Sequence, residues 1–235
     1  MALVTDRRAG DFGEVLRAGI DAADDVLHVV DPDAAAVEAL VDVLAAATDP
    51  PETQVTTGEA TLKRATEDFL VASRAADLIA AEALSLNADE TAGHTLLVAD
   101  ETVHAVVRAD DRVAALSTDD GEFVETAARA SRERADDADR FSLRTPPLSR
   151  VRETLSETAG EAALADFDAA LDACHEAGVA VPEVTLSLLI AARNDVLLYD
   201  VSRWGEDVGI ASKATFSRTK SRLEEAGLID TEKAP

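Results

Sequence analysis

Hydrophobic and polar positions follow two different periods along the front half of the chain. Short β-branched runs at Val26–Val30 and 54–57 are each followed by a longer stretch with helical spacing, at 33–47 and 61–84. Buried strands read as short apolar runs, whereas amphipathic helices repeat about every 3.6 residues. After a short opening helix at 11–24, this order predicts a right-handed unit of parallel strands and helices.

The pattern changes after residue 83. Short apolar runs separated by acidic turns predict a hairpin-rich sheet, and a charged helix is expected next. The strands are expected at 84–86, 94–99, 103–107 and 113–116, and the helix at 121–139.

A break and a second helical region follow. Pro146 and Pro147 cannot continue a helix, so 140–152 is predicted to be a linker. We expect one long helix at 148–177, whose apolar stripe either lies in the core or joins two subunits. The linker arginines either pair with the acidic body, which we prefer, or touch DNA backbone; they are Arg140, Arg144, Arg150 and Arg152.

The last stretch predicts two helices joined by a tight turn. A helix at 201–207 is followed by Gly209, and a longer helix begins at Ser212 and ends at Gly227. Serine accepts a hydrogen bond from the first free backbone N–H groups, and glycine tolerates the left-handed conformation after the last turn. Residues 182–195 supply a preceding helix. These features predict a helix-turn-helix, whose second helix can enter a DNA major groove.

The charges on the second helix favour that use. No acidic residue occurs from Val208 to Leu223, in a chain with 47 acidic and 22 basic residues. At about 100° per residue, Phe216, Thr219 and Leu223 share one face, which we expect to point inward. The opposite face is expected to point outward and carries Ala214, Ser217, Arg218 and Ser221. A solvated terminal helix would be the plainer interpretation of such a charge run.

The composition adds a second constraint. The formal net charge is −25, the sequence pI is about 4.3, and aromatic residues make up only 3 %. Because the acids are spread along the chain, we interpret them as an adaptation to high salt in an archaeal protein. Residues 1–182 carry 15 basic and 38 acidic residues, but 183–235 carry 7 and 9. The C-terminal part is thus nearly neutral, as a surface that approaches phosphate requires.

A resemblance makes this interpretation sharper. The string SKATFSRTKSRLEEAGLI resembles the recognition helix of winged helix-turn-helix regulators. It departs from them at Lys220, where leucine is frequent, so the stem of the lysine must pack instead. The sequence ends where a wing hairpin would begin, so we expect a truncated wing. The resemblance places the recognition helix at Ser212–Ala226, with DNA contacts expected from Ser212, Lys213, Thr215, Ser217, Arg218, Lys220, Ser221 and Arg222.

The front half resembles a second family weakly. The stretch HTLLVADETVHAVVRADD resembles the strand–turn–strand of phospholipase D-like domains, which serve as effector modules in sugar-responsive archaeal regulators of the TrmB family. In the enzymes, a histidine and a lysine two residues later attack a phosphodiester. Here the residue two positions after His104 is Val106, and the residue two positions after His94 is Leu96. The catalytic pair is therefore missing. We therefore expect no enzyme activity and assign no catalytic residue.

Other candidate residues have plainer explanations. We expect His28, His94 and His104 to be hydrogen-bonded sheet residues. Asp31 and Asp100 end strands, where ligand crevices form, but a turn role is favoured. The lone Cys174 cannot form an intrachain disulfide and is expected to be structural. We predict no metal, no cofactor, no membrane span and a cytoplasmic location.

The whole chain resembles the TbsP-type transcriptional regulators of haloarchaea, most strongly over residues 183–233. The resemblance implies a sequence-specific regulator of central-carbon metabolic genes that acts on promoter DNA. Two half-sites would require a homodimer, and the front domain could bind a small metabolite effector. The alternative is a metabolite-binding protein or enzyme whose helix-turn-helix is a packing element. We expect an α/β or α+β domain at 1–140, a linker with a long helix at 141–180, and the winged helix-turn-helix domain at 181–235.

Overall fold

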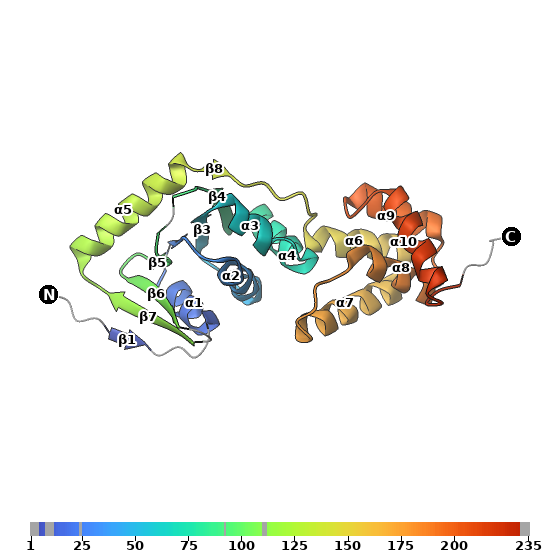
Figure 1. The fold of residues 1–235 in the computed structure, drawn as a ribbon, viewed down its shortest axis with the longest axis horizontal. Helices are drawn as coiled ribbons and strands as arrows, with labels where there is room; N and C mark the ends of the chain where they lie inside the picture. The colour runs from blue at the N-terminus through green and yellow to red at the C-terminus, as the bar shows by residue number, and fades with distance from the viewer. Residues whose placement is uncertain (1–4, 8–11, 24, 92, 110–111, 231–235) are drawn as a thin grey trace. The chain divides into compact units, whose positions relative to one another are not determined.

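A computed structural model describes residues 5–7, 12–23, 25–91, 93–109 and 112–230. These residues form two compact units (Figure 1). The front unit comprises the residues up to 67 together with 78–142. The C-terminal unit comprises 68–77 together with the residues from 143 onward.

The front unit is built on one mixed sheet. Its strand order over the described residues is β1-β7-β6-β5-β2-β3-β4-β8. Strands β2, β3 and β4 are parallel, and every other pair is antiparallel. The hairpins predicted after residue 83 are confirmed for β5, β6 and β7, whereas the prediction for β4, which was expected among them, is wrong because β4 pairs in parallel with β3. The strands are β1 (Thr5–Arg7), β2 (Val26–Val30), β3 (Glu52–Thr57), β4 (Leu84–Ala88), β5 (Leu96–Val98), β6 (Val103–Ala109), β7 (Arg112–Thr118) and β8 (Asp139–Arg140).

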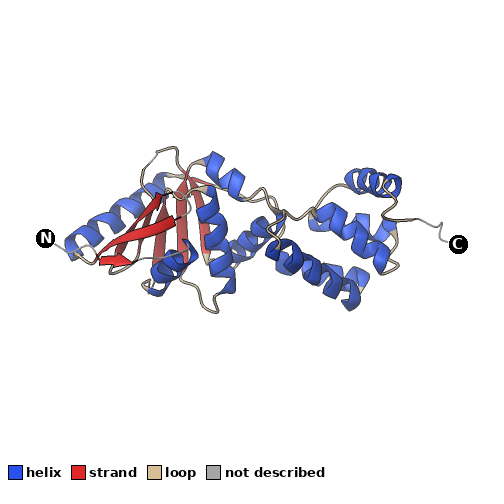
Figure 2. Ribbon diagram, turned by 60° about the horizontal axis from the view of Figure 1, so that its bottom comes forward, coloured by secondary structure: helices blue, strands red, loops and turns tan. Residues whose placement is uncertain are grey.

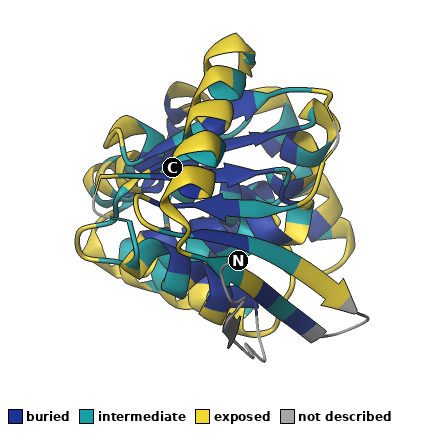
Figure 3. Cartoon of the chain, turned by 90° about the vertical axis from the view of Figure 1, so that its left-hand side faces the viewer, coloured by how far each residue is buried: buried dark blue, intermediate teal, exposed yellow. Residues whose placement is uncertain are grey.

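Helices cover both faces of this sheet (Figure 2). Helices α1 (Phe12–Asp21), α2 (Ala34–Ala46) and α3 (Glu59–Ala65) pack together on one face, and α5 (Gly121–Asp137) lies across the other. The first face is closely packed with leucine, valine and alanine. Most of α5 is exposed, and the buried strands lie behind it (Figure 3). The fold class predicted for the front half is confirmed.

The single helix predicted at 61–84 is wrong. Helix α3 ends at Ala65, and α4 (Phe69–Ala80) begins after a short break. At the break, Asp68 Oδ1 accepts hydrogen bonds from the backbone N–H groups of Leu70 and Val71, at 2.9 and 3.1 Å. A side chain that satisfies the free N–H groups starts a new helix. The chain then turns at Glu82, which has a φ of 59°, and enters β4.

The C-terminal unit is entirely helical in its described residues. It contains α6 (Leu148–Ala159), α7 (Glu161–Glu176), α8 (Glu183–Arg193), α9 (Leu198–Val208) and α10 (Lys213–Glu225). One core joins all five helices, and Phe167 and Phe216 are among its fully buried side chains. The apolar stripe predicted for 148–177 lies in this core. Of the two alternatives given for the stripe, the structure therefore favours the core.

That core also includes the first turn of α4. Phe69 and Leu70 are buried in the same cluster as Leu148 and Phe167. Asp68 Oδ2 accepts a hydrogen bond from the backbone N–H of Val181 at 2.9 Å, and Asp77 accepts one from the hydroxyl of Ser149. A short segment from the first third of the sequence is therefore part of the C-terminal unit.

The long helix predicted at 148–177 is two helices. Gly160, with a φ of 86°, ends α6 and precedes α7. A residue with a side chain rarely adopts this left-handed conformation, which glycine adopts without cost. Of the linker arginines, Arg152 pairs with Asp168 of α7 at 2.7 Å, whereas Arg140, Arg144 and Arg150 are exposed. Residues 231–235, where the wing was expected to begin, lie outside the described residues.

Candidate nucleic-acid interface

Helices α9 and α10 form the predicted helix-turn-helix, supported by α8. Gly209 ends α9 in the left-handed conformation, with a φ of 98°, and the N–H of Ile210 reaches back to the carbonyl of Gly205. Ser212 then caps α10, because its Oγ accepts a hydrogen bond from the N–H of Thr215 at 3.3 Å. After α10, Gly227 has a φ of 67°. The predicted turn, cap and end are confirmed.

The angle between the two helices depends on one close contact. Phe216 of α10 is fully buried, and its ring lies directly against Gly205 of α9. Trp204, beside that glycine, is buried and donates a hydrogen bond from its Nε1 to Thr154 of α6 at 2.9 Å. The inward face of α10 is thereby fixed on the core, and its opposite face is left in solvent.

We expect Gly205→Ala to destabilise the C-terminal unit by about 1–3 kcal/mol, because the new Cβ would overlap the Phe216 ring. This loss should exceed the gain in helix propensity, which is about 1 kcal/mol. Urea unfolding followed by the fluorescence of Trp204, the only tryptophan of the chain, measures the change.

The control is Gly121→Ala at the start of α5, where a Cβ would meet nothing within 4 Å. Followed by circular dichroism, this variant should stay within about 0.5 kcal/mol of the parent. The double variant Gly205→Ala/Phe216→Leu should recover part of the lost stability. A neutral Gly205→Ala would show that the ring does not press on the glycine.

The outward face of α10 carries the predicted contact residues. Ala214, Ser217, Arg218 and Ser221 are exposed, as the helical spacing predicts, and so are Ser212, Lys213 and Arg222. Ser217 and Ser221 form an intrahelical pair, since the hydroxyl of Ser221 donates to the carbonyl of Ser217 at 3.3 Å. Arg218 is held along its own helix by bonds to the Ala214 carbonyl and the Thr215 hydroxyl.

The lysines on this helix differ from the arginines in their surroundings. The ammonium of Lys213 lies 3.2 Å from a carboxylate oxygen of Glu206, and that hydrogen bond lowers the pKa of Glu206. Lys220 pairs with Glu224 at 2.6 Å, and its side chain is only 21 % exposed, as expected for a packed stem. With the residues that the structure describes, Arg218 and Arg222 form no ion pair. The arginines are thus the cations that are open to an anionic partner.

Two family models cover almost all of the chain. One, described as "Transcriptional regulator TbsP-like, N-terminal", matches residues 4–146. The other, described as "Transcriptional regulator TbsP-like, C-terminal HTH domain", matches residues 147–235. The chain belongs to the TbsP-like transcriptional regulators. The resemblance stated from the sequence is confirmed, and the helix-turn-helix geometry lies within the matched C-terminal domain.

Solved structures similar to this TbsP-like regulator are remote. TrmBL2, described as an archaeal chromatin protein with a novel mode of DNA binding, has a TM-score of 0.43 and 16 % identity. The match covers 59 % of this chain and 54 % of TrmBL2, so the chain spans about half of that protein's length. No curated protein matches the chain.

Two further structures match the TbsP-like regulator. Nuc from Salmonella typhimurium, a phospholipase D family member, has a TM-score of 0.41 and 12 % identity over 60 % of this chain and 97 % of Nuc. NucT from Helicobacter pylori has a TM-score of 0.39 and 13 % identity over 60 % of this chain and 100 % of NucT. At this distance the likenesses bear on neither activity nor ligands.

The three histidines of the front unit of this TbsP-like chain differ from one another. His104 is buried in β6, with Nδ1 2.7 Å from the Ser117 hydroxyl and Nε2 3.3 Å from that of Thr102, so its prediction is confirmed. His94 is exposed and precedes β5, so the sheet position predicted for it is wrong. His28 is buried in β2, but its Nδ1 has no hydrogen-bond partner among the described residues. The expectation of a fully bonded ring is therefore wrong for His28.

An ion-pair cluster in the TbsP-like front unit is not predicted from the sequence. Arg134 of α5 donates to both carboxylate oxygens of Asp31, from Nη1 at 2.7 Å and from Nη2 at 2.6 Å. Its Nε donates to Asp89, and its Nη2 also donates to the carbonyl of Thr91. The cluster ties α5 to the ends of β2 and β4. Asp31 lies in a bend directly after β2, with a φ of 47°, and its carboxylate forms this ion pair in addition to the turn position predicted for it.

The other residues singled out from the sequence have ordinary structural roles. Asp100 ends β5 and accepts a hydrogen bond from the N–H of Asp25 at 3.1 Å. Cys174 is a free thiol, half-buried beside the C-terminal core. Among the residues with described positions, no three histidine, cysteine, aspartate or glutamate side chains are grouped to hold a metal ion. No described helix is both long and apolar enough to span a bilayer.

Proposed function

We propose that α10 is the recognition helix of a sequence-specific regulator and enters the major groove of promoter DNA. The observation that carries this proposal is the exposed face of α10, where Ser217, Arg218 and Ser221 lie together within the stretch from Val208 to Leu223 that contains no acidic residue. Arginine pairs with guanine edges, and hydroxyl groups contact bases or phosphates. The TbsP-like C-terminal domain match supports the same role.

The proposed contacts divide into two groups. Ser217, Arg218 and Ser221 face the base edges, because they occupy the middle of the outward face. The other residues lie at the ends or flanks of the helix and contact the phosphate backbone, which fixes position without reading sequence. This second group is Ser212, Lys213, Thr215, Lys220 and Arg222. Since Lys213 and Lys220 pair with glutamates, Arg222 is expected to contribute most of the salt-dependent binding.

We predict that Arg218→Ala weakens operator binding by about 1–3 kcal/mol and relaxes the preference at one base pair. Fluorescence anisotropy in concentrated KCl, on operator and random duplexes, measures both effects. The matched control is Arg203→Ala on α9, which removes the same charge from an exposed arginine paired with Asp207. Equal losses on operator and random DNA for Arg218→Ala would contradict the base-reading role.

The targets are proposed to be promoters of central-carbon metabolic genes, which the TbsP-type resemblance supports. A homodimer on two half-sites is proposed with them, together with a front unit that binds a small metabolite effector. Genome-wide crosslinking in the native high-salt host should give discrete promoter peaks. These peaks should disappear with the Arg218→Ala/Arg222→Ala double variant, and light scattering should show a dimer.

The alternative function is a metabolite-binding protein whose helix-turn-helix is only a packing element. An even crosslinking background that does not change in the double variant would favour this alternative. Peaks away from metabolic promoters would keep the DNA-binding role and reject the proposed targets.

A further inference from the structure

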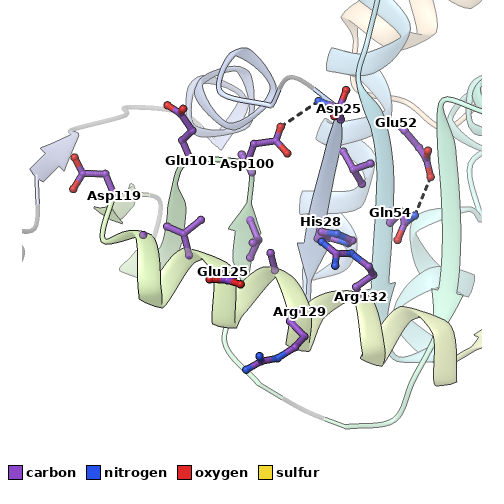
Figure 4. A pocket seen from close by; sticks show the side chains of 16 residues that line it. Asp25, His28, Glu52, Gln54, Asp100, Glu101, Asp119, Glu125, Arg129 and Arg132 are labelled. Carbon is purple, nitrogen blue, oxygen red and sulfur yellow. Dashed lines mark hydrogen bonds between the residues drawn. The ribbon is translucent and has the colours of Figure 1, made fainter.

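The front unit contains a cavity of about 950 Å³ between α5 and the neighbouring face of the sheet (Figure 4). Its floor comes from β2, β3 and the end of β5, and its roof is the part of α5 from Gly121 to Arg132. All of its lining residues belong to the front unit. The cavity is not part of the helix-turn-helix or of the Arg134 cluster, so the DNA-binding proposal does not explain it.

The floor is polar in the middle of the sheet. His28 and Gln54 are direct neighbours across β2 and β3, and Glu52 lies beside them on the same face. Gln54 donates to Glu52 at 2.9 Å. A sheet face beneath a helix is normally apolar, as on the opposite side of this sheet. Three polar side chains at this position provide hydrogen-bonding groups that packing alone does not require.

His28 is the least satisfied group in this floor. Its side chain is buried, only 5 % of the residue is exposed, and its Nδ1 has no partner among the described residues. Buried polar atoms are nearly always hydrogen-bonded, so an unpaired one marks a place for a missing partner. Burial lowers the pKa of His28, and the positive charge of Arg132 lowers it further. The imidazole is therefore neutral at pH 7 and can donate or accept one hydrogen bond there.

The charges around the cavity are arranged at two ends. Arg132 projects from α5 beside His28, whereas Arg129 points away from the sheet (Figure 4). Arg132 has no ion pair with any described residue, although acidic side chains surround the cavity. At the other end, Asp25 and Asp100 are linked by a hydrogen bond, and Glu101 lies next to them. One side therefore offers the guanidinium of Arg132 and the imidazole of His28, with Glu52 held by Gln54 beside them, and the other side offers only carboxylates.

We propose that this cavity is a binding site for a small zwitterionic organic molecule. Its carboxylate pairs with the guanidinium of Arg132 and accepts a hydrogen bond from His28. Its ammonium group lies among the carboxylates of Asp25, Asp100 and Glu101. This inference names a site for the proposed effector role, but it does not depend on α10 or on DNA.

The balance of charge excludes simpler ligands. Six carboxylates and two guanidinium groups line the cavity, so an isolated anion meets a net repulsion. An isolated cation would be attracted, but it would leave His28 and Arg132 without partners. A molecule that carries both charges, separated along a chain, supplies a partner for Arg132 and His28 and also for the carboxylates.

The test uses the full-length protein and three probes of equal chain length. These are δ-aminovalerate, which is a zwitterion, valerate, which is only an anion, and pentylamine, which is only a cation. Calorimetry measures affinity, and the imidazole nitrogen signals of the labelled protein report on His28. We expect δ-aminovalerate to bind saturably, at least about tenfold more tightly than either other probe, and to shift the His28 signals.

Arg132→Gln should weaken this binding about tenfold or more, whereas Arg150→Gln, an exposed arginine of α6, should leave it unchanged. Circular dichroism confirms that both variants are folded. Equal affinity for the three probes, no saturable binding, or no effect of Arg132→Gln would overturn the proposal. Operator binding is measured separately on the same variants. Zwitterion binding without operator binding would reject the DNA role and keep this site.

Discussion

Phe216→Ala is expected to destabilise the C-terminal unit by about 3–5 kcal/mol, a larger loss than either Gly205→Ala or Arg134→Ala should cause. The ring is fully buried and fills the space above Gly205, so its removal leaves a cavity between α9 and α10. Urea unfolding followed by Trp204 fluorescence measures the loss, because Trp204 is in the same core. Operator binding should also fall, since the outward face of α10 would no longer be fixed.

The matched control is Phe123→Ala on α5, where the ring is 54 % exposed. The same chemical change at this position should cost less than about 1 kcal/mol, because little apolar area is removed from a buried site. Circular dichroism follows this variant, since the front unit contains no tryptophan. A loss below about 1 kcal/mol for Phe216→Ala would show that α10 does not depend on this anchor.

Arg134→Ala is expected to destabilise the front unit by about 2–3 kcal/mol, somewhat less than the 3–5 kcal/mol typical of a fully buried pair. The expected loss of stability is smaller because solvent partly reaches the cluster, in which the Arg134 side chain is 20 % exposed. Without the guanidinium, the carboxylates of Asp31 and Asp89 remain without their shared cation. Hydrogen exchange of the β2 and β4 amides measures the change, and Arg134→Lys should retain only part of the stability.

Arg129→Ala removes an exposed arginine from the same helix and should change the stability by less than about 0.5 kcal/mol. Acid titration adds a second readout. The hydrogen bond from Arg134 lowers the pKa of Asp89 in the folded state, so the unfolded chain binds more protons below about pH 4. The Asp89 contribution is therefore complete above that pH and is lost as the pH falls. Arg134→Ala should flatten this acid dependence, and an unchanged slope would contradict the assigned pair.

The helix-turn-helix could be predicted from the sequence because its signals are local. Ser212, Gly209 and Gly227 act within a few residues of their own positions, and the spacing of Phe216 and Leu223 places the buried face directly. The predicted outward face depends on the same period. These features are confirmed in the structure, whereas the DNA contacts themselves remain a proposal.

The predictions that are wrong have local causes of a different kind. At Asp68 a side chain starts a new helix within an apolar pattern that continues across the break. At Gly160 a left-handed residue separates two helices that share one apolar stripe. The spacing of hydrophobic residues indicates which face of a helix is buried, but it does not indicate whether one helix or two successive helices carry that face.

The ion-pair cluster and the cavity could not be predicted because their parts are distant in sequence. Arg134 is 103 residues from Asp31 and 45 from Asp89, and nothing in a charged helix marks one arginine among several. Likewise, His28 belongs to an ordinary apolar run. Only the pairing of β2 with β3, and the position of α5 above them, show that its ring faces a polar space.

The contribution of Asp68–Asp77 to the C-terminal unit has a consequence for how the protein folds during synthesis. Phe69 and Leu70 leave the ribosome well before the helices that cover them, so they stay solvated until α6 to α8 are complete. Contacts between such distant residues slow folding, because a long loop must close first. A fragment that starts at residue 147 would lack both side chains and expose the surface they occupy. The boundary between the two family models therefore does not coincide with the division of the chain into two compact units.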